Sequence, residues 1–141
     1  MENEQERSTT FFRFEDLRIY HKSLDYVNWL YSQATSVQDE PLVKSFYDRF
    51  MVSAQSISLN IAEGSSRNKS QFVYYLKMAK SSVRECVVLS TIGQTRAYIN
   101  DEDYDYSKNQ LMEMTKMIGA LIGSLQRSVR STESDADDDT D

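Results

Sequence analysis

The sequence predicts an all-α protein, an up-down-up-down antiparallel four-helix bundle, and three observations lead to this. Apolar residues recur every three or four positions along four long segments, which is the spacing of one helix face. The 141 residues include only four glycines and one proline, so few residues interrupt helices. No stretch alternates between apolar and polar residues in the manner of a half-buried strand. Short turns between helices of similar length favour antiparallel packing.

The first two helices are expected at residues 14–35 and 41–63. Pro41 suits the first position of a helix, and Asp39 or Glu40 stands where a cap would lie. The core stripe expected on the second helix comprises Val43, Phe46, Phe50, Ala54, Ile57 and Ile61. The stripe expected on the first comprises Leu17, Tyr20, Leu24, Val27, Tyr31 and Ala34.

The third and fourth helices are expected at residues 70–99 and 103–130. Ser70 is the predicted N-cap of the third helix. On the fourth, Gly119 and Gly123 lie beside the apolar stripe and together cost about 1–2 kcal/mol of helix propensity. A close approach of another helix would account for them.

Gly64 is the expected point of reversal between the second and third helices. A glycine just past a helix accepts the left-handed conformation that closes the helix end without a steric cost at Cβ. No other glycine occurs before Gly93. The sequence therefore predicts a glycine-closed turn here.

Charge divides the chain into three parts: a polar leader at residues 1–13, one helical domain at 14–130, and an acidic tail at 131–141. The formal net charge is −6, yet residues 1–132 hold 16 acidic and 16 basic groups, because the last nine residues hold six acids and no base. The tail has no apolar side chain larger than alanine, so we expect it to be disordered. It either solvates the protein or competes with polyanions for a basic surface.

Several functional classes find no support in the sequence. No apolar run approaches the roughly 20 residues that span a bilayer, and the N-terminus is too polar for a signal peptide, so we expect a cytoplasmic protein of bacterial type without membrane association. The single cysteine, Cys86, excludes an intramolecular disulfide and falls on a core stripe. The single histidine, His21, has no partner for a helical di-metal site. We expect no catalytic residues, metal or cofactor, and no enzymatic activity.

A second set of apolar residues points away from the expected core stripes. Any one exposed apolar side chain is ordinary, but three helices showing such residues together favour a subunit interface. The candidate interface residues are Ile19, Tyr26, Val52, Leu59, Val88 and Ile92. The sequence therefore predicts a homo-oligomer.

A basic segment gives the main hint of a ligand. Residues 65–84 contain five basic residues and no acidic one, and Lys77, Lys80 and Arg84 share a helix face. Such a face either is merely solvated or releases counterions from a phosphate backbone, with Tyr74 near its edge to stack on a base. The candidate nucleic-acid contacts are Arg67, Lys69, Tyr74, Lys77, Lys80 and Arg84. The overall acidity argues against a dedicated nucleic-acid binder.

Several motifs resemble one bacterial family. They are Phe14-Glu15-Asp16-Leu17, Asn60-Ile61-Ala62-Glu63-Gly64, Arg67, and the series Phe72, Leu76, Ala79, Ser82 and Glu85. Together they resemble the four-helix-bundle proteins encoded within intervening sequences of 23S ribosomal RNA genes. The resemblance implies a ring-like homopentamer in the cytoplasm with a largely unassigned role, and distant kinship with the nucleic-acid-binding accessory proteins of diversity-generating retroelements.

The polar residues of these motifs have structural interpretations. We expect the amide of Asn60 to hydrogen-bond the backbone near the end of the second helix, with a ligand contact as the alternative. Glu63 and Glu85 are expected in salt bridges or caps, with Arg67 and Arg84 nearby. Two functional hypotheses follow: an oligomeric scaffold or adaptor for a protein partner, and an RNA-binding accessory protein that uses the basic face of the third helix.

Overall fold

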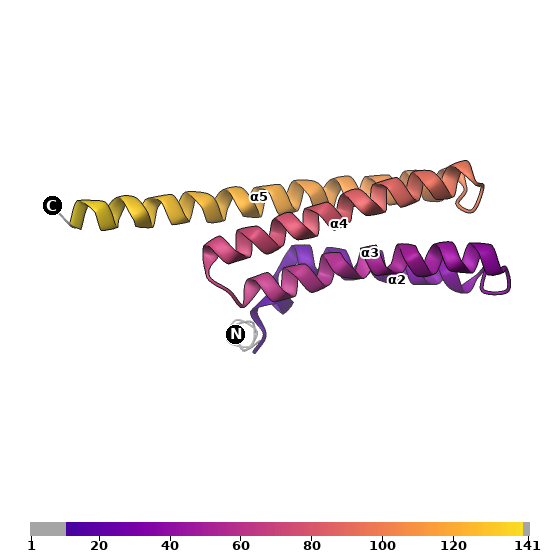
Figure 1. Cartoon of the computed structure of the whole chain (residues 1–141), viewed down its shortest axis with the longest axis horizontal. Helices are drawn as coiled ribbons and strands as arrows, with labels where there is room; N and C mark the ends of the chain where they lie inside the picture. Colours follow the sequence, from indigo (N-terminus) through magenta and orange to yellow (C-terminus); the bar gives the residue numbers. More distant parts are fainter. Residues whose placement is uncertain (1–10, 140–141) are drawn as a thin grey trace, which may run out of the picture.

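The computed structural model describes residues 11–139, with side chains described as far as Ser131. Within that range the protein is entirely helical and contains no strand. The elements are the 3-10 turn η1 (Arg13–Asp16) and the helices α2 (Arg18–Thr35), α3 (Pro41–Ser65), α4 (Lys69–Thr95) and α5 (Asp101–Asp139), shown in Figure 1.

Each helix packs against its sequence neighbours, and α5 also contacts α2, which closes the set into a bundle. The α2–α3 and α4–α5 turns lie at one end, and the α3–α4 turn lies at the other with both chain termini (Figure 1). This arrangement confirms the prediction of four helices that run alternately up and down. Helix α5 is the longest and projects past the end that carries the α3–α4 turn.

The core lies along the bundle axis and draws apolar side chains from all four helices. On α2 the core stripe differs from the predicted one: Ile19 and Tyr26 are 3% and 1% exposed, and Leu30 is fully buried. The assignment of Ile19 and Tyr26 to an oligomer interface was therefore wrong. The pattern misled because Ser23 occupies a core position on the same face, where its hydroxyl hydrogen-bonds Ser58 at 2.8 Å.

The predicted stripe of the first helix serves another surface. Tyr20, Leu24 and Val27 are only half-buried, and with Leu59 of α3 they line a groove of about 450 Å³ between α2 and α3. We call this the α2–α3 groove. The apolar spacing exists, but these residues lie at the edge of the buried face of α2 rather than at its centre.

The helix boundaries differ from the predicted ones at several ends, and α2 begins at Arg18 rather than at residue 14, because Arg13–Asp16 form the turn η1. Asn68, rather than Ser70, caps α4, because its side chain accepts a hydrogen bond from the Gln71 amide at 2.9 Å. Asn100 caps α5 in the same way by accepting from the Asp103 amide at 2.7 Å. Pro41 begins α3 as predicted, but Glu40 makes no side-chain capping bond.

Helix α4 ends at Thr95, before the predicted Ile99, because Ala97 adopts a positive φ of 60°. This left-handed residue turns the chain so that the amides of Tyr98 and Ile99 bond back to the Gly93 carbonyl at 2.8 and 3.2 Å. The side chain of Ile99 then enters the core.

The predicted leader and tail fall partly outside the described residues. Residues 1–10 of the leader lie outside them, and so do residues 140–141 and the side chains of 132–139 in the tail. Helix α5 continues to Asp139 rather than ending near Arg130. Disorder of the acidic tail in solution stays a prediction.

A chain of hydrogen bonds crosses the core and joins three helices. Ser90 Oγ donates to the Cys86 carbonyl at 2.8 Å, so it must accept from Ser107, whose Oγ lies 2.7 Å away. Ser107 in turn accepts from the hydroxyl of Tyr26, also at 2.7 Å. Each of the three hydroxyls in this buried chain therefore donates one hydrogen bond. Together these bonds fix α2, α4 and α5 relative to one another.

Candidate interaction surfaces

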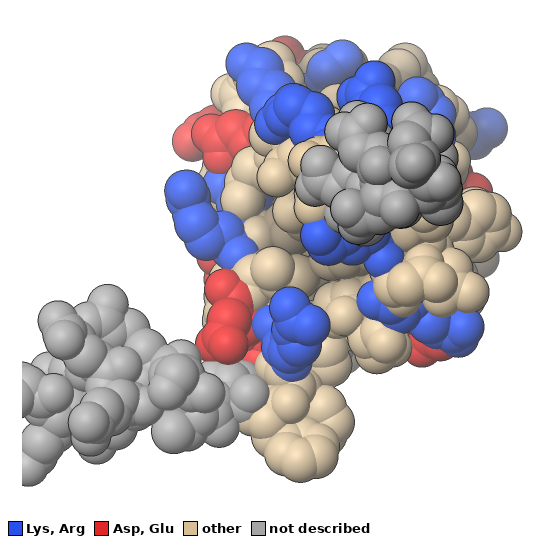
Figure 2. Space-filling view, turned by 90° about the vertical axis from the view of Figure 1, so that its left-hand side faces the viewer, with Lys and Arg blue, Asp and Glu red and all other residues tan. Residues whose placement is uncertain are grey.

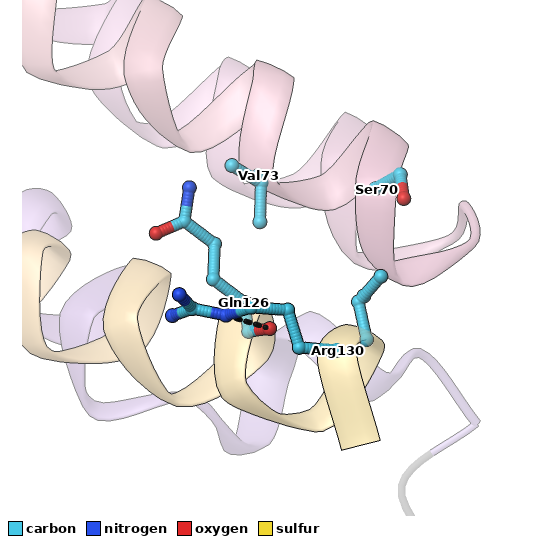
Figure 3. Close-up of a pocket in the computed structure, with 5 residues that line it drawn as sticks. Ser70, Val73, Gln126 and Arg130 are labelled. Atoms are coloured by element: carbon cyan, nitrogen blue, oxygen red, sulfur yellow. Dashed lines mark hydrogen bonds between the residues drawn. The ribbon is translucent and has the colours of Figure 1, made fainter. Parts of the chain in front are cut away.

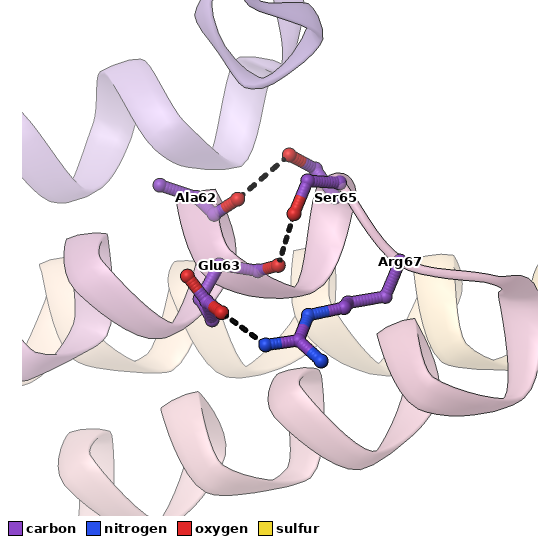
Figure 4. Close-up of polar contacts among 5 residues, drawn as sticks. Ala62, Glu63, Ser65 and Arg67 are labelled. Atoms are coloured by element: carbon purple, nitrogen blue, oxygen red, sulfur yellow. Dashed lines mark hydrogen bonds and ion pairs between the residues drawn. The ribbon is translucent and has the colours of Figure 1, made fainter.

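The α3–α4 turn is closed by serines rather than by a left-handed glycine. Ser65 Oγ donates to the Ala62 carbonyl and Ser66 Oγ to the Glu63 carbonyl, each at 2.9 Å (Figure 4). No residue of this turn has a positive φ. These hydroxyls satisfy carbonyls that the helix end leaves without intrahelical partners.

Gly64 lies inside α3 and is buried, so its predicted role as the left-handed glycine that closes the turn was wrong. A Cβ on this residue would lie 2.6 Å from the Cβ of Tyr75 and 2.9 Å from a ring carbon of Phe72, both on α4. Glycine is needed here because the two helices approach too closely for a side chain.

The carboxylate of Glu63 pairs with Arg67 as predicted, and the guanidinium of Arg67 also lies over the ring of Tyr75 (Figure 4). Hydrogen bonding to Glu63 raises the pKa of Arg67. Because both side chains are exposed, the pair stabilises the fold only slightly. Arg67 therefore already has a local partner.

Glu85 has a different partner from the predicted Arg84. Its carboxylate accepts a hydrogen bond from Ser53 of α3 at 3.0 Å, and Ser53 in turn accepts from Arg49 at 2.6 Å. The side-chain amide of Asn60 donates to a backbone carbonyl, as predicted, but the acceptor is Ser56 at 2.8 Å, one turn earlier in α3, rather than a group at the end of the helix. Glu85 thus holds α4 against α3, and the Asn60 amide is committed on one side to its own helix.

Four of the six predicted interface residues are exposed. Val52 and Leu59 on α3 are 59% and 67% exposed, and Val88 and Ile92 on α4 are 58% and 39% exposed. Met78, which is also exposed on α4, was not among the predicted interface residues. We define the α3–α4 face as Val52, Met78, Val88 and Ile92; Leu59 belongs to the α2–α3 groove.

The predicted cations divide into two groups. Arg67 lies at the bundle end, and Lys69 there donates to Ser128 of α5. Lys77, Lys80 and Arg84 lie farther along α4, where Lys77 and Arg84 are exposed and Lys80 is half-buried. Neither group lies in a concave site with the candidate base-stacking residue Tyr74, whose exposed ring packs edge-on against Tyr75.

The bundle end that carries the α3–α4 turn is rich in Lys and Arg (Figure 2). A cavity of about 590 Å³ lies there, and Arg13, Arg67 and Lys69 line it together with Asp16. The carboxylates of Asp16 and of Glu63, which pairs with Arg67, offset part of this positive charge, and Lys69 donates to the neutral hydroxyl of Ser128.

The surroundings of the single histidine and the single cysteine indicate structural roles for both. His21 is exposed, and its ring nitrogen donates to the Glu15 carbonyl at 2.5 Å. Cys86 is fully buried, and burial raises the pKa of its thiol to about 12, with the neighbouring Glu85 adding to the shift. A thiol held in its protonated form is a poor nucleophile. Among the described residues, no three His, Cys, Asp or Glu side chains are grouped to bind a metal ion.

The fold and surfaces define a small helical-bundle protein with apolar and basic surfaces on its outer helices. Within residues 11–139, no helix is both long and apolar enough to cross a membrane. No curated protein matches the chain.

The family model of the 23S rRNA-intervening sequence protein matches residues 15–120, and the chain belongs to this family. A crystal structure of a protein of unknown function from the S23 ribosomal protein family of Bacteroides thetaiotaomicron VPI-5482 has a similar fold. Its TM-score is 0.68 at 21% sequence identity, and the similarity covers 74% of this chain and 97% of that one.

Proposed function

We propose that the protein is a non-enzymatic scaffold in the cytoplasm that assembles into a ring of identical subunits. The observation that carries this proposal is that apolar side chains meet solvent at two places: Val52 and Val88 are exposed on the α3–α4 face, and Leu24, Val27 and Leu59 line the α2–α3 groove. Exposed apolar surfaces of this kind mark interaction sites.

Two different surfaces favour a head-to-tail contact. In such a contact the face of one copy meets the groove of the next, and successive copies close into a ring if the rotation permits. The family resemblance supports five copies. The helices that take no part in this contact, α5 among them, would then be repeated in every subunit and could bind a partner protein.

Sedimentation velocity on charged variants tests the head-to-tail contact. Val52→Glu with Val88→Glu blocks the face, and Leu59→Glu with Val27→Glu blocks the groove; each variant alone should sediment as a monomer. Mixed in equal amounts, they retain one intact face and one intact groove, so we expect a heterodimer. Met112→Glu, which changes an exposed residue of α5, is the control and should leave the ring intact.

A mixture that stays monomeric would reject the head-to-tail contact. If the face-blocked variant alone still formed the full oligomer, the α3–α4 face would play no part in assembly.

A further inference from the structure

Helix α5 extends the basic surface that the sequence located on α4 alone. Among residues 107–131 it carries one acidic residue, Glu113. We define the α4–α5 basic face as six of the cations of the two helices: Lys77, Lys80, Arg84, Lys108, Lys116 and Arg130.

The antiparallel register places these cations beside one another. At one end of the helix pair, Gln94 of α4 donates to Asp101 of α5 at 3.1 Å, and at the other end Lys69 donates to Ser128. Residues 77–84 of α4 therefore lie opposite residues 112–119 of α5. In this register Lys80 of α4 is level with Lys116 of α5.

The acidic residues of this part of both helices are engaged elsewhere. Glu85 accepts from Ser53 on α3, and Glu113 forms an ion pair with Lys22 of α2 at 2.5 Å. Each carboxylate is thus held on a flank of the helix pair, away from the seam between α4 and α5. The positive charge of the face is not neutralised by these two groups.

The surface beside the cations is open at two places. A Cβ on Gly119 would meet no atom within 4 Å, so bare helix backbone is open next to Lys116. Nearer the end of the pair, Gln126 and Arg130 of α5 lie across from Val73 of α4 and line an open hollow of about 360 Å³ (Figure 3). A broad partner can therefore approach the face without meeting large side chains at these points.

We propose that the α4–α5 basic face binds the phosphate backbone of a nucleic-acid duplex. This goes beyond the scaffold function and rests on other residues, although Arg84 lies one helical turn from Val88 of the α3–α4 face. From Lys108 to Arg130 the helix rises by about 33 Å, which is close to one turn of duplex, about 34 Å. Six cations along that length release counterions from phosphates without reading sequence.

A duplex fits this face better than a single strand does. Binding of single strands relies on aromatic side chains on which bases stack. The candidate aromatic residue Tyr74 is exposed one helical turn from Lys77, at the edge of the face, and its ring packs edge-on against Tyr75. The six residues that define the face include no aromatic ring on which a base could stack.

Fluorescence anisotropy with the full chain tests the proposal. The probes are labelled 20-base-pair RNA and DNA duplexes and a single-stranded RNA of the same length, titrated at 50 to 200 mM salt. We expect both duplexes to bind more tightly than the single strand. Six phosphate contacts give a salt slope near −5, so duplex affinity should fall by about 10³-fold over this range.

Paired charge reversals locate the binding surface. Lys80→Glu with Lys116→Glu should weaken duplex binding at 50 mM salt by at least about tenfold. The control, Arg18→Glu with Lys44→Glu, changes the net charge equally through exposed residues of α2 and α3 and should bind nearly as the wild type does. Circular dichroism verifies that each variant is folded.

Three results would overturn the proposal: no duplex binding at 50 mM salt, equal losses in the two paired variants, or tighter binding of the single strand. None of them bears on assembly through the α3–α4 face, which sedimentation measures separately.

Discussion

Gly64 and Gly119 are both glycines inside long helices, but their surroundings are opposite. A side chain at Gly64 would collide with Tyr75 and Phe72, whereas a side chain at Gly119 would meet nothing within 4 Å. The first glycine is explained by contacts inside the subunit. The second costs about 1 kcal/mol of helix propensity, and no contact inside the subunit explains it. The difference distinguishes faces of the bundle that are already packed from faces that are open.

Gly64→Ala should have the largest effect on stability, a loss of about 2–3 kcal/mol, because overpacking of this kind strains the helix contact. The nearest atom is the Cβ of Tyr75, which cannot rotate away. Chemical denaturation measures the loss. A variant as stable as the wild type would show that α3 and α4 can separate slightly at no cost.

Ser107→Ala should cost about 1–3 kcal/mol, because it leaves the buried hydroxyl of Tyr26 without an acceptor. Ser81→Ala is the matched control, since that exposed hydroxyl only returns to its own helix. Equal stabilities of the two variants in urea would mean that the buried chain of hydroxyls contributes little.

Stability should fall as the pH rises above about 9. Burial raises the pKa of Cys86 from 9.0 to about 12, so in this range the unfolded thiol loses its proton while the folded one keeps it. The loss is at most about 1.4 kcal/mol per pH unit. Cys86→Ala should flatten the decline between pH 9 and 10.

Burial also raises the pKa of Tyr26, whose ordinary value is 10.0, so a decline should persist above pH 10 in the Cys86→Ala variant. Unchanged slopes between pH 9 and 10 in that variant would contradict a buried, protonated thiol.

Gly119→Ala should stabilise the fold by about 1 kcal/mol, the difference in helix propensity. Thermal unfolding measures this gain. If duplex binding needs the bare backbone at this position, the same variant should bind the duplex more weakly, and Ser124→Ala, on an exposed position of α5, should not. A loss of stability in Gly119→Ala would mean that the α4–α5 face is already covered in the assembled protein.

The sequence predicted the parts of the fold that depend on apolar spacing. The predicted stripe of α3 proved correct where large residues such as Phe50 and Ile57 repeat. The stripe of α2 was wrong because a core serine, Ser23, carries no apolar signal and finds its partner on another helix. Gly64 was misinterpreted because close contact and a left-handed turn both require glycine.

The surfaces were predicted only in part for a related reason. Lys77, Lys80 and Arg84 are neighbours on one helix, so their shared face follows from sequence spacing alone. Lys116 joins them only through the packing of α5 against α4, and Glu85 is removed from them only by Ser53 of α3. Such contacts between helices have no signature in a single sequence.

The most direct test of assembly through the α3–α4 face and the α2–α3 groove is sedimentation equilibrium of the full wild-type chain over a wide concentration range. We predict one dominant species with a mass several times that of the subunit, five times if the ring has the size that the family resemblance implies. A folded monomer at high micromolar concentration would contradict it.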